Sequence, residues 1–227
     1  MSYNVSQHTR KTARVRSLFV AALVLACAFG TVTYAAAETV TPPTTPTAIA
    51  VPAGNVAFLE GHAFGTQGYT CLPTSTGGAD WSKDARPEAT LFTDVFGQPV
   101  QIITHFLSPD ANPNDFAPKP LPLGGNATWQ SSFDSSRVWA VKTGAISAGS
   151  DLASCPNSGA IACLLLQSIG NQKGPTGGKI LAKTTFVQRL NTDGGNTPAD
   201  GCAVSGDVGK TQLVPYTADY YFFRKAD

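Results

Sequence analysis

The stretch GNVAFLEGHAFGTQGYTC, residues 54–71, decides the fold class because a long extended pattern ends there in a cysteine. Large side chains between Val56 and Phe64 share one face by period 2, whereas the opposite face carries mostly Ala and Gly. Gly65 to Gly68 predict a bulge or a tight bend that changes the facing of the residues after it. A strand with one large face and one small face suits the interior of a layered β fold.

The rest of the chain repeats this extended character in shorter runs. The sequence has 22 Gly and 16 Pro, which favours turns and strands, and it shows no convincing long helix. Two aromatic runs around the turn at residues 134–136 predict a hairpin. We therefore predict an all-β, single-domain fold, a β-sandwich or a barrel-like fold with long loops, of which Ser108–Asn126 is the longest.

Residues 1–37 have the pattern of a secretory signal peptide. Four basic residues precede the apolar run Leu18–Gly30, and Ala35–Ala37 supplies small residues for cleavage. The apolar run is shorter than the roughly 20 residues of a transmembrane helix, so no stable membrane span is expected after cleavage. An uncleaved anchor and lipidation at Cys27 remain alternatives. The sequence predicts a secreted, periplasmic or cell-surface protein.

The leader also changes the charge balance. Its loss removes 4 of 16 basic residues and leaves 12 against 15 acidic ones, a net charge of −3, which argues against nucleic acid as a partner. Residues 38–53 are rich in Thr and Pro and predict a mobile linker before a β domain at residues 54–227.

Four cysteines follow the leader, and an even number in an exported chain predicts two disulfides. Three pairings are possible, and we favour Cys71 with Cys202 and Cys155 with Cys163. The competing interpretation is metal ligation, which has little support because no C-x-x-C pair occurs. We assign no metal ligand and no cofactor.

Six short motifs along the chain resemble, in the same order, an uncharacterised family of exported bacterial and fungal proteins catalogued as a domain of unknown function. The resemblance implies secretion and a mostly β domain, and it supplies no established activity. Some fungal members carry a malate dehydrogenase label, but here no strand leads into G-x-G-x-x-G and a helix. The motifs are Gly65-x-Gln67-x-Tyr69-x-Cys71, Pro87-Glu88-Ala89-Thr90-Leu91, His105-Phe106-x-x-Pro109, Leu164-Leu165-Leu166, Gln188-Arg189-x-Asn191-Thr192-x-Gly194-Gly195-x-x-Pro198 and Pro215-Tyr216-x-Ala218-x-Tyr220-x-Phe222.

His105 is the first candidate for catalysis, because a histidine with a carboxylate partner is the usual general base of a hydrolase. Glu60 and Glu88 are the candidate carboxylates. The competing interpretation is a buried histidine that is hydrogen bonded to the backbone or to a tyrosine.

Aromatic side chains are the candidates for binding. Aromatic platforms are how many β domains bind sugars and other flat ligands; the competing interpretation is that most of these residues belong to the core. The candidate ligand-binding residues are Trp81, Trp129, Trp139, Tyr69 and His62. Our first expectation is a non-catalytic binding or surface-associated domain whose partner is a small molecule or a polysaccharide, such as an envelope polymer. The alternatives are a secreted hydrolase using His105 and a purely structural surface protein.

Overall fold

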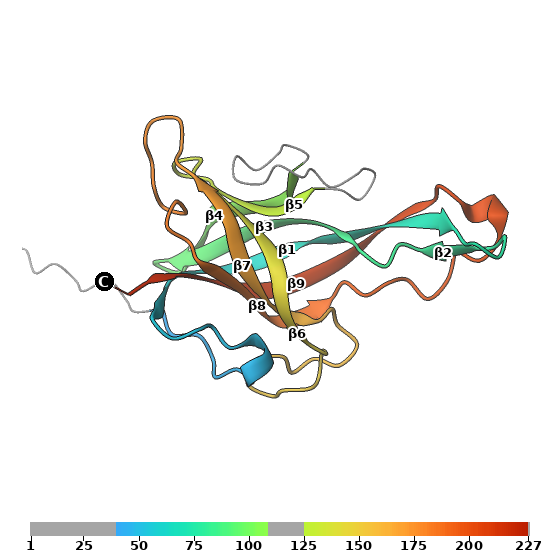
Figure 1. The fold of residues 1–227 in the computed structure, drawn as a ribbon, viewed down its shortest axis with the longest axis horizontal. Helices are drawn as coiled ribbons and strands as arrows, with labels where there is room; N and C mark the ends of the chain where they lie inside the picture. The colour runs from blue at the N-terminus through green and yellow to red at the C-terminus, as the bar shows by residue number, and fades with distance from the viewer. Residues whose placement is uncertain (1–39, 109–124, 227) are drawn as a thin grey trace, which may run out of the picture. The chain divides into compact units, whose positions relative to one another are not determined.

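The computed structural model describes residues 40–108 and 125–226, and almost every regular element in them is a β-strand (Figure 1). The predicted leader, Cys27 and most of the predicted loop at 108–126 lie outside the described residues. No helix in the described part of the chain is long and apolar enough to cross a membrane. The elements are η1 (Thr47–Ile49), β1 (Asn55–Pro73), β2 (Ala79–Trp81), β3 (Arg86–Val95), β4 (Gln98–Ser108), β5 (Asn126–Ser131), β6 (Arg137–Ile146), β7 (Cys163–Gln172), β8 (Phe186–Gly194), η2 (Ser205–Asp207) and β9 (Thr211–Lys225).

The strands form one antiparallel sheet that closes on itself. From β3 to β9 each strand pairs with the next one along the chain, and β1 pairs with both β3 and β9, which completes a ring of eight strands (Figure 1). The short β2 pairs only with the last residues of β1. The all-β prediction is confirmed, and of its two alternatives the barrel-like one is found. Closure satisfies the backbone hydrogen bonds that two open edges would leave unpaired.

The predicted opening strand is the longest element of the ring, because β1 runs for 19 residues. The bulge expected between Gly65 and Gly68 is wrong, since pairing with β9 is continuous there and its irregularity lies between Ala57 and Leu59. Because Gly65 has no side chain, β1 and β3 can lie close together at this position. A Cβ atom at this position would stand 2.1 Å from the carbonyl oxygen of Glu88 on β3.

Alternation along each strand fills one end of the ring with apolar side chains. Leu91, Ile103 and Phe222 are fully buried members of this core. Leu181, in the connection between β7 and β8, closes the same end, where the β3–β4 and β5–β6 turns also lie. The backbone N–H of Leu181 donates to the Ser136 hydroxyl in the β5–β6 turn at 2.9 Å. This end of the ring is therefore packed shut.

Residues 40–53, predicted as a mobile linker, pack on the outside of the ring instead. Ile49 in η1 is completely buried, and its carbonyl oxygen accepts a 2.7 Å hydrogen bond from Gln188 Nε2. The mobile linker was predicted from the Thr- and Pro-rich composition of this segment. That composition does not show that the apolar side chain of Ile49 packs into a pocket on the outer face of the sheet. That pocket is a second core of residues Cys155, Cys163, Leu165, Leu190, Tyr221 and Phe223.

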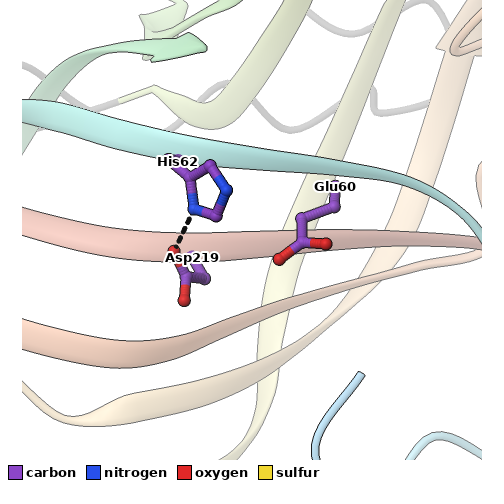
Figure 2. A group of neighbouring side chains, drawn as sticks. All are labelled: Glu60, His62 and Asp219. Carbon is purple, nitrogen blue, oxygen red and sulfur yellow. Dashed lines mark hydrogen bonds and ion pairs between the residues drawn. The ribbon is translucent and has the colours of Figure 1, made fainter. Parts of the chain in front are cut away.

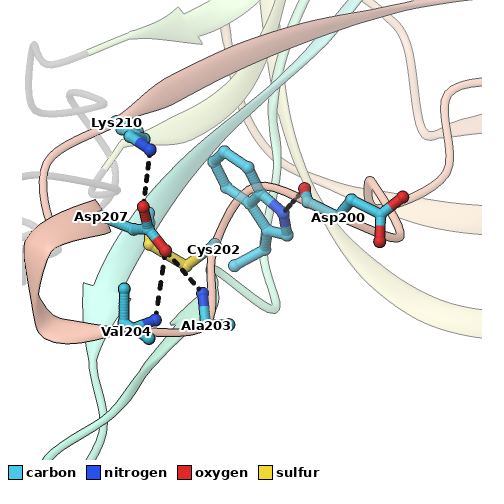
Figure 3. Close-up of polar contacts among 8 residues, drawn as sticks. Asp200, Cys202, Ala203, Val204, Asp207 and Lys210 are labelled. Atoms are coloured by element: carbon cyan, nitrogen blue, oxygen red, sulfur yellow. Dashed lines mark hydrogen bonds and ion pairs between the residues drawn. A yellow bond between two sulfur atoms is a disulfide. The ribbon is translucent and has the colours of Figure 1, made fainter.

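Both predicted disulfides are confirmed, as Cys71–Cys202 and Cys155–Cys163. The first joins the end of β1 to the connection between β8 and β9, where Asp207 accepts hydrogen bonds from the backbone N–H groups of Ala203 and Val204 at 3.0 and 3.1 Å (Figure 3). Trp81 of β2 donates its Nε1 hydrogen to the carbonyl oxygen of Asp200 in the same connection. The disulfide and these contacts hold β2 beyond the rim of the ring.

Candidate functional site

The opposite end of the ring is hollow. A cavity of about 610 Å³ lies inside it, lined by side chains from the last residues of β1, the first residues of β3 and the corresponding ends of the other ring strands. Its volume falls within the range of cavities that hold small organic ligands. Small residues make room for it, because Ala127 and Ala140 occupy inward positions of β5 and β6.

His105 on β4 stands at the centre of the cavity wall, and only 3% of its surface is exposed. The imidazole stacks on the Trp129 ring with 4.3 Å between centroids and 5° between planes. Its Nδ1 hydrogen is donated to the carbonyl oxygen of Thr128 at 2.9 Å. Burial lowers the pKa of His105 to about 4; the nearby charge of Arg189 adds to this effect and the bond to Thr128 opposes it. The ring is therefore neutral at pH 7, and Nε2 is the unprotonated nitrogen.

Two buried side chains of the cavity wall carry N–H groups without an acceptor. Gln67 on β1 is 4% exposed and Trp129 on β5 is 1% exposed. Neither Gln67 Nε2 nor Trp129 Nε1 has a hydrogen-bond partner among the described residues. Buried donors are normally paired, so each of these two needs an explanation.

Arg189 on β8 brings a positive charge to the same wall. Its Nε and Nη2 atoms donate to the carbonyl oxygen of Ala162 at 3.2 and 2.8 Å. Within the described part of the chain, its guanidinium forms no ion pair with a carboxylate. Tyr69, whose hydroxyl donates to the carbonyl oxygen of Gly195 at 2.7 Å, lines the wall beside it. Burial raises the pKa of Tyr69, so this hydroxyl stays protonated at pH 7.

The rim of the cavity is exposed and also carries more positive than negative charge. Lys83, Asp84 and Lys142 lie there. Together with Arg189 the lining holds three cationic side chains and one carboxylate. The field inside the cavity therefore favours a negatively charged occupant.

The six motifs of the family resemblance meet in this cavity. Each contributes at least one lining side chain, although the motifs are spread from β1 to β9. The contributing residues are Gln67, Tyr69, Pro87, His105, Leu164, Leu166, Arg189 and Tyr220. The residues that carry the resemblance thus line one feature of the fold.

The candidate catalytic residues are not brought together. His105 faces the inside of the ring, whereas Glu60 and Glu88 alternate with the inward residues Gly61 and Ala89 and point outward. The sheet itself separates the imidazole from both carboxylates. The prediction that His105 works with Glu60 or Glu88 is therefore wrong, because the period-2 alternation places them on opposite faces.

The candidate binding residues are divided. Tyr69 and Trp129 line the cavity, whereas Trp81 packs with the Cys71–Cys202 disulfide and Trp139 is buried away from the cavity lining. All three tryptophan rings are buried, so they form no exposed aromatic platform. His62 lies on the outer face of β1.

His62 belongs to a different group of side chains that the sequence did not reveal. Pairing of β1 with β9 places it opposite Asp219, and its Nδ1 lies 2.6 Å from Asp219 Oδ1 (Figure 2). Glu60 completes a set whose ligand atoms all lie within 4.8 Å of one another, a combination that suits zinc. Asn191 Nδ2 also donates to Asp219, at 2.8 Å. The His62–Asp219 ion pair and this amide account for the cluster without an ion.

Gln67 and Arg189 are the site residues that the sequence analysis did not select. Both stand in motifs of the family resemblance, which was the available signal. A glutamine and an arginine within strands are usually surface residues, and nothing local shows that these two point inward.

The family model described as protein of unknown function (DUF3455) matches residues 52–224. This range includes all nine strands except the last residue of β9. No curated protein and no solved structure matches the chain.

Proposed function

The chain belongs to the DUF3455 family, and we propose that it is a non-catalytic, extracytoplasmic binding domain that holds a small organic molecule in the open end of its β ring. The observation that carries the proposal is the cavity with two unpartnered buried donors, Gln67 Nε2 and Trp129 Nε1. An occupant with acceptor atoms would satisfy both donors.

The chemistry of the wall supports binding rather than hydrolysis. The described lining contains no Ser, Thr or Cys, and its lysines are exposed at the rim, away from His105. Nδ1 of His105 is bonded to a backbone carbonyl oxygen and not to a carboxylate that would orient the ring. The only carboxylate of the described lining is Asp84, which is exposed at the rim.

The shape of the site supports a small molecule rather than a polymer. A polysaccharide is usually held along an open row of aromatic rings, whereas all three tryptophans here are buried, and Trp129 and Tyr69 line the cavity. Location outside the cytoplasm is supported by the two disulfides and by the predicted leader.

A fluorescence titration that measures binding of the neutral probe N-phenyl-1-naphthylamine tests the proposal. We expect saturable 1:1 binding to the wild-type protein. Leu107→Trp and Ala127→Trp each add an indole to the wall and should abolish binding, whereas Glu88→Trp, on the outer face, should retain it. Circular dichroism identifies the variants that fold. Full binding by a folded Leu107→Trp variant, or absence of saturable binding both of this probe and of anionic apolar ligands, would overturn the proposal.

A further inference from the structure

Among the buried polar side chains of the cavity wall, donors outnumber acceptors, and His105 Nε2 is an unprotonated acceptor. Gln67 Nε2 and Trp129 Nε1 are buried donors without acceptors. The Tyr69 hydroxyl uses its hydrogen on Gly195, and Arg189 offers only N–H groups. An occupant that satisfies this wall must therefore bring acceptor atoms.

The charge of Arg189 further restricts the chemical class of the occupant. Its guanidinium is partly buried and, among the described residues, it is bonded to a neutral carbonyl oxygen and to no carboxylate. A cation held in a partly dry site without a counter-ion costs folding free energy, which a bound anion offsets. A guanidinium and two neutral donors match the planar, singly charged carboxylate group, whose two oxygens accept several hydrogen bonds.

A doubly charged phosphate fits less well. It would require a second cation beside Arg189, but Lys83 and Lys142 are exposed at the rim. His105 inside the wall is neutral and stacked on Trp129, so it supplies no charge.

Part of the remaining cavity wall is apolar. Leu107, Ile161, Leu164 and Leu166 line it together with the alanines of β5 and β6. An occupant that buries surface against these side chains needs a hydrocarbon or aromatic body.

On the basis of the proposed binding function, we propose that the cavity binds an organic monocarboxylate with an apolar body, whose carboxylate is held by Arg189, Gln67 and Trp129. The apolar body packs on the leucines of β4 and β7. The ligand class is thus that of medium-chain fatty acids and arylalkanoic acids.

Isothermal titration calorimetry with octanoate and its neutral analogue octanamide tests this assignment, with octyl phosphate as a third probe. We expect octanoate to bind at least about tenfold more tightly than octanamide, since a hydrogen bond to a charged group is worth that much. Arg189→Gln should remove this preference and leave octanamide binding unchanged. The matched control Arg224→Gln changes an exposed arginine on β9 outside the lining and should behave as wild type.

The possible outcomes distinguish a failure of the carboxylate assignment from a failure of the proposed binding function. If the neutral probe binds but octanoate and octanamide bind equally, the carboxylate assignment is wrong and the binding function stands. Tighter binding of octyl phosphate than of octanoate also overturns the assignment, in favour of a phosphate ligand. If the neutral probe and all three octyl compounds fail to bind, both are wrong. A folded Gln67→Leu variant should lose part of the octanoate affinity, and unchanged affinity would remove Gln67 from the site.

Discussion

Replacement of His105 by phenylalanine should change how the stability of this protein depends on pH. The folded protein holds His105 neutral, because burial lowers its pKa from 6.5 to about 4. The unfolded chain binds a proton at this residue below pH 6.5, while the folded protein does so only below about pH 4. Stability from this residue is therefore complete above pH 6.5 and is lost as the pH falls toward 4.

The magnitude follows from the same two pKa values. At pH 4.5 the excess protonation of the unfolded state costs about 2–3 kcal/mol, and at pH 5.5 it costs about 1–2 kcal/mol. Phenylalanine keeps the apolar ring against Trp129 but does not titrate, so the variant should lack this component. His105→Gln, which can still donate to the Thr128 carbonyl oxygen, should lack it as well.

Urea unfolding of wild type and both variants at pH 7.5, 5.5 and 4.5 measures the effect. Loss of the ring contacts or of the Thr128 bond shifts each variant by an amount that does not depend on pH, and carboxylates titrate in all three proteins. The free energy of unfolding of wild type, taken relative to each variant, should therefore fall by about 2–3 kcal/mol between pH 7.5 and 4.5. A difference constant to about 0.5 kcal/mol, beyond the extrapolation error, would refute a buried neutral imidazole.

Three further changes test the fold. Replacement of Cys71 and Cys202 by alanine opens a loop with a sequence separation of 131 residues and should lower the free energy of unfolding by about 4 to 5 kcal/mol in chemical denaturation; a loss below about 1 kcal/mol would contradict this. Gly65→Ala places a methyl group against a backbone oxygen of β3 and should cost roughly 1–3 kcal/mol or more, whereas Gly206→Ala, in open space, should be nearly neutral; equal melting temperatures would show that the strands are not this close. Ile49→Ala should cost about 2–5 kcal/mol if residues 40–53 are docked on the ring, and an unchanged midpoint in urea would restore the mobile linker.

The amino-acid sequence was sufficient for the β class and for both disulfides. Alternation of side chains is a local property of a strand, so the long pattern ending at Cys71 could be recognised without any partner. An even cysteine count with one short spacing favoured the pairing that the structure confirms. The family was also recognisable, since its motifs are local.

Closure of the ring required the tertiary structure. A sandwich and a barrel are built from strands with the same alternation, and they differ in whether the first strand meets the last. Here β1 pairs with β9, whose residues are about 150 positions away in the sequence. Glu60 lies on the outer face of β1 and His105 lies inside the ring, and the pairing of β1 with β3 and β9 decides which face of β1 is the outer one.

The features of the candidate site also divide into those that the sequence could identify and those that only the tertiary structure revealed. His105, Tyr69 and Trp129 could be selected from residue type alone, because histidines and amphipathic aromatic rings are uncommon and chemically versatile. That Arg189 lies in the same wall, that one end of the ring is filled and the other hollow, and that two donors are left without acceptors depend on which side chains eight strands bring together. These are properties of packing between distant segments, so the tertiary structure alone decided them.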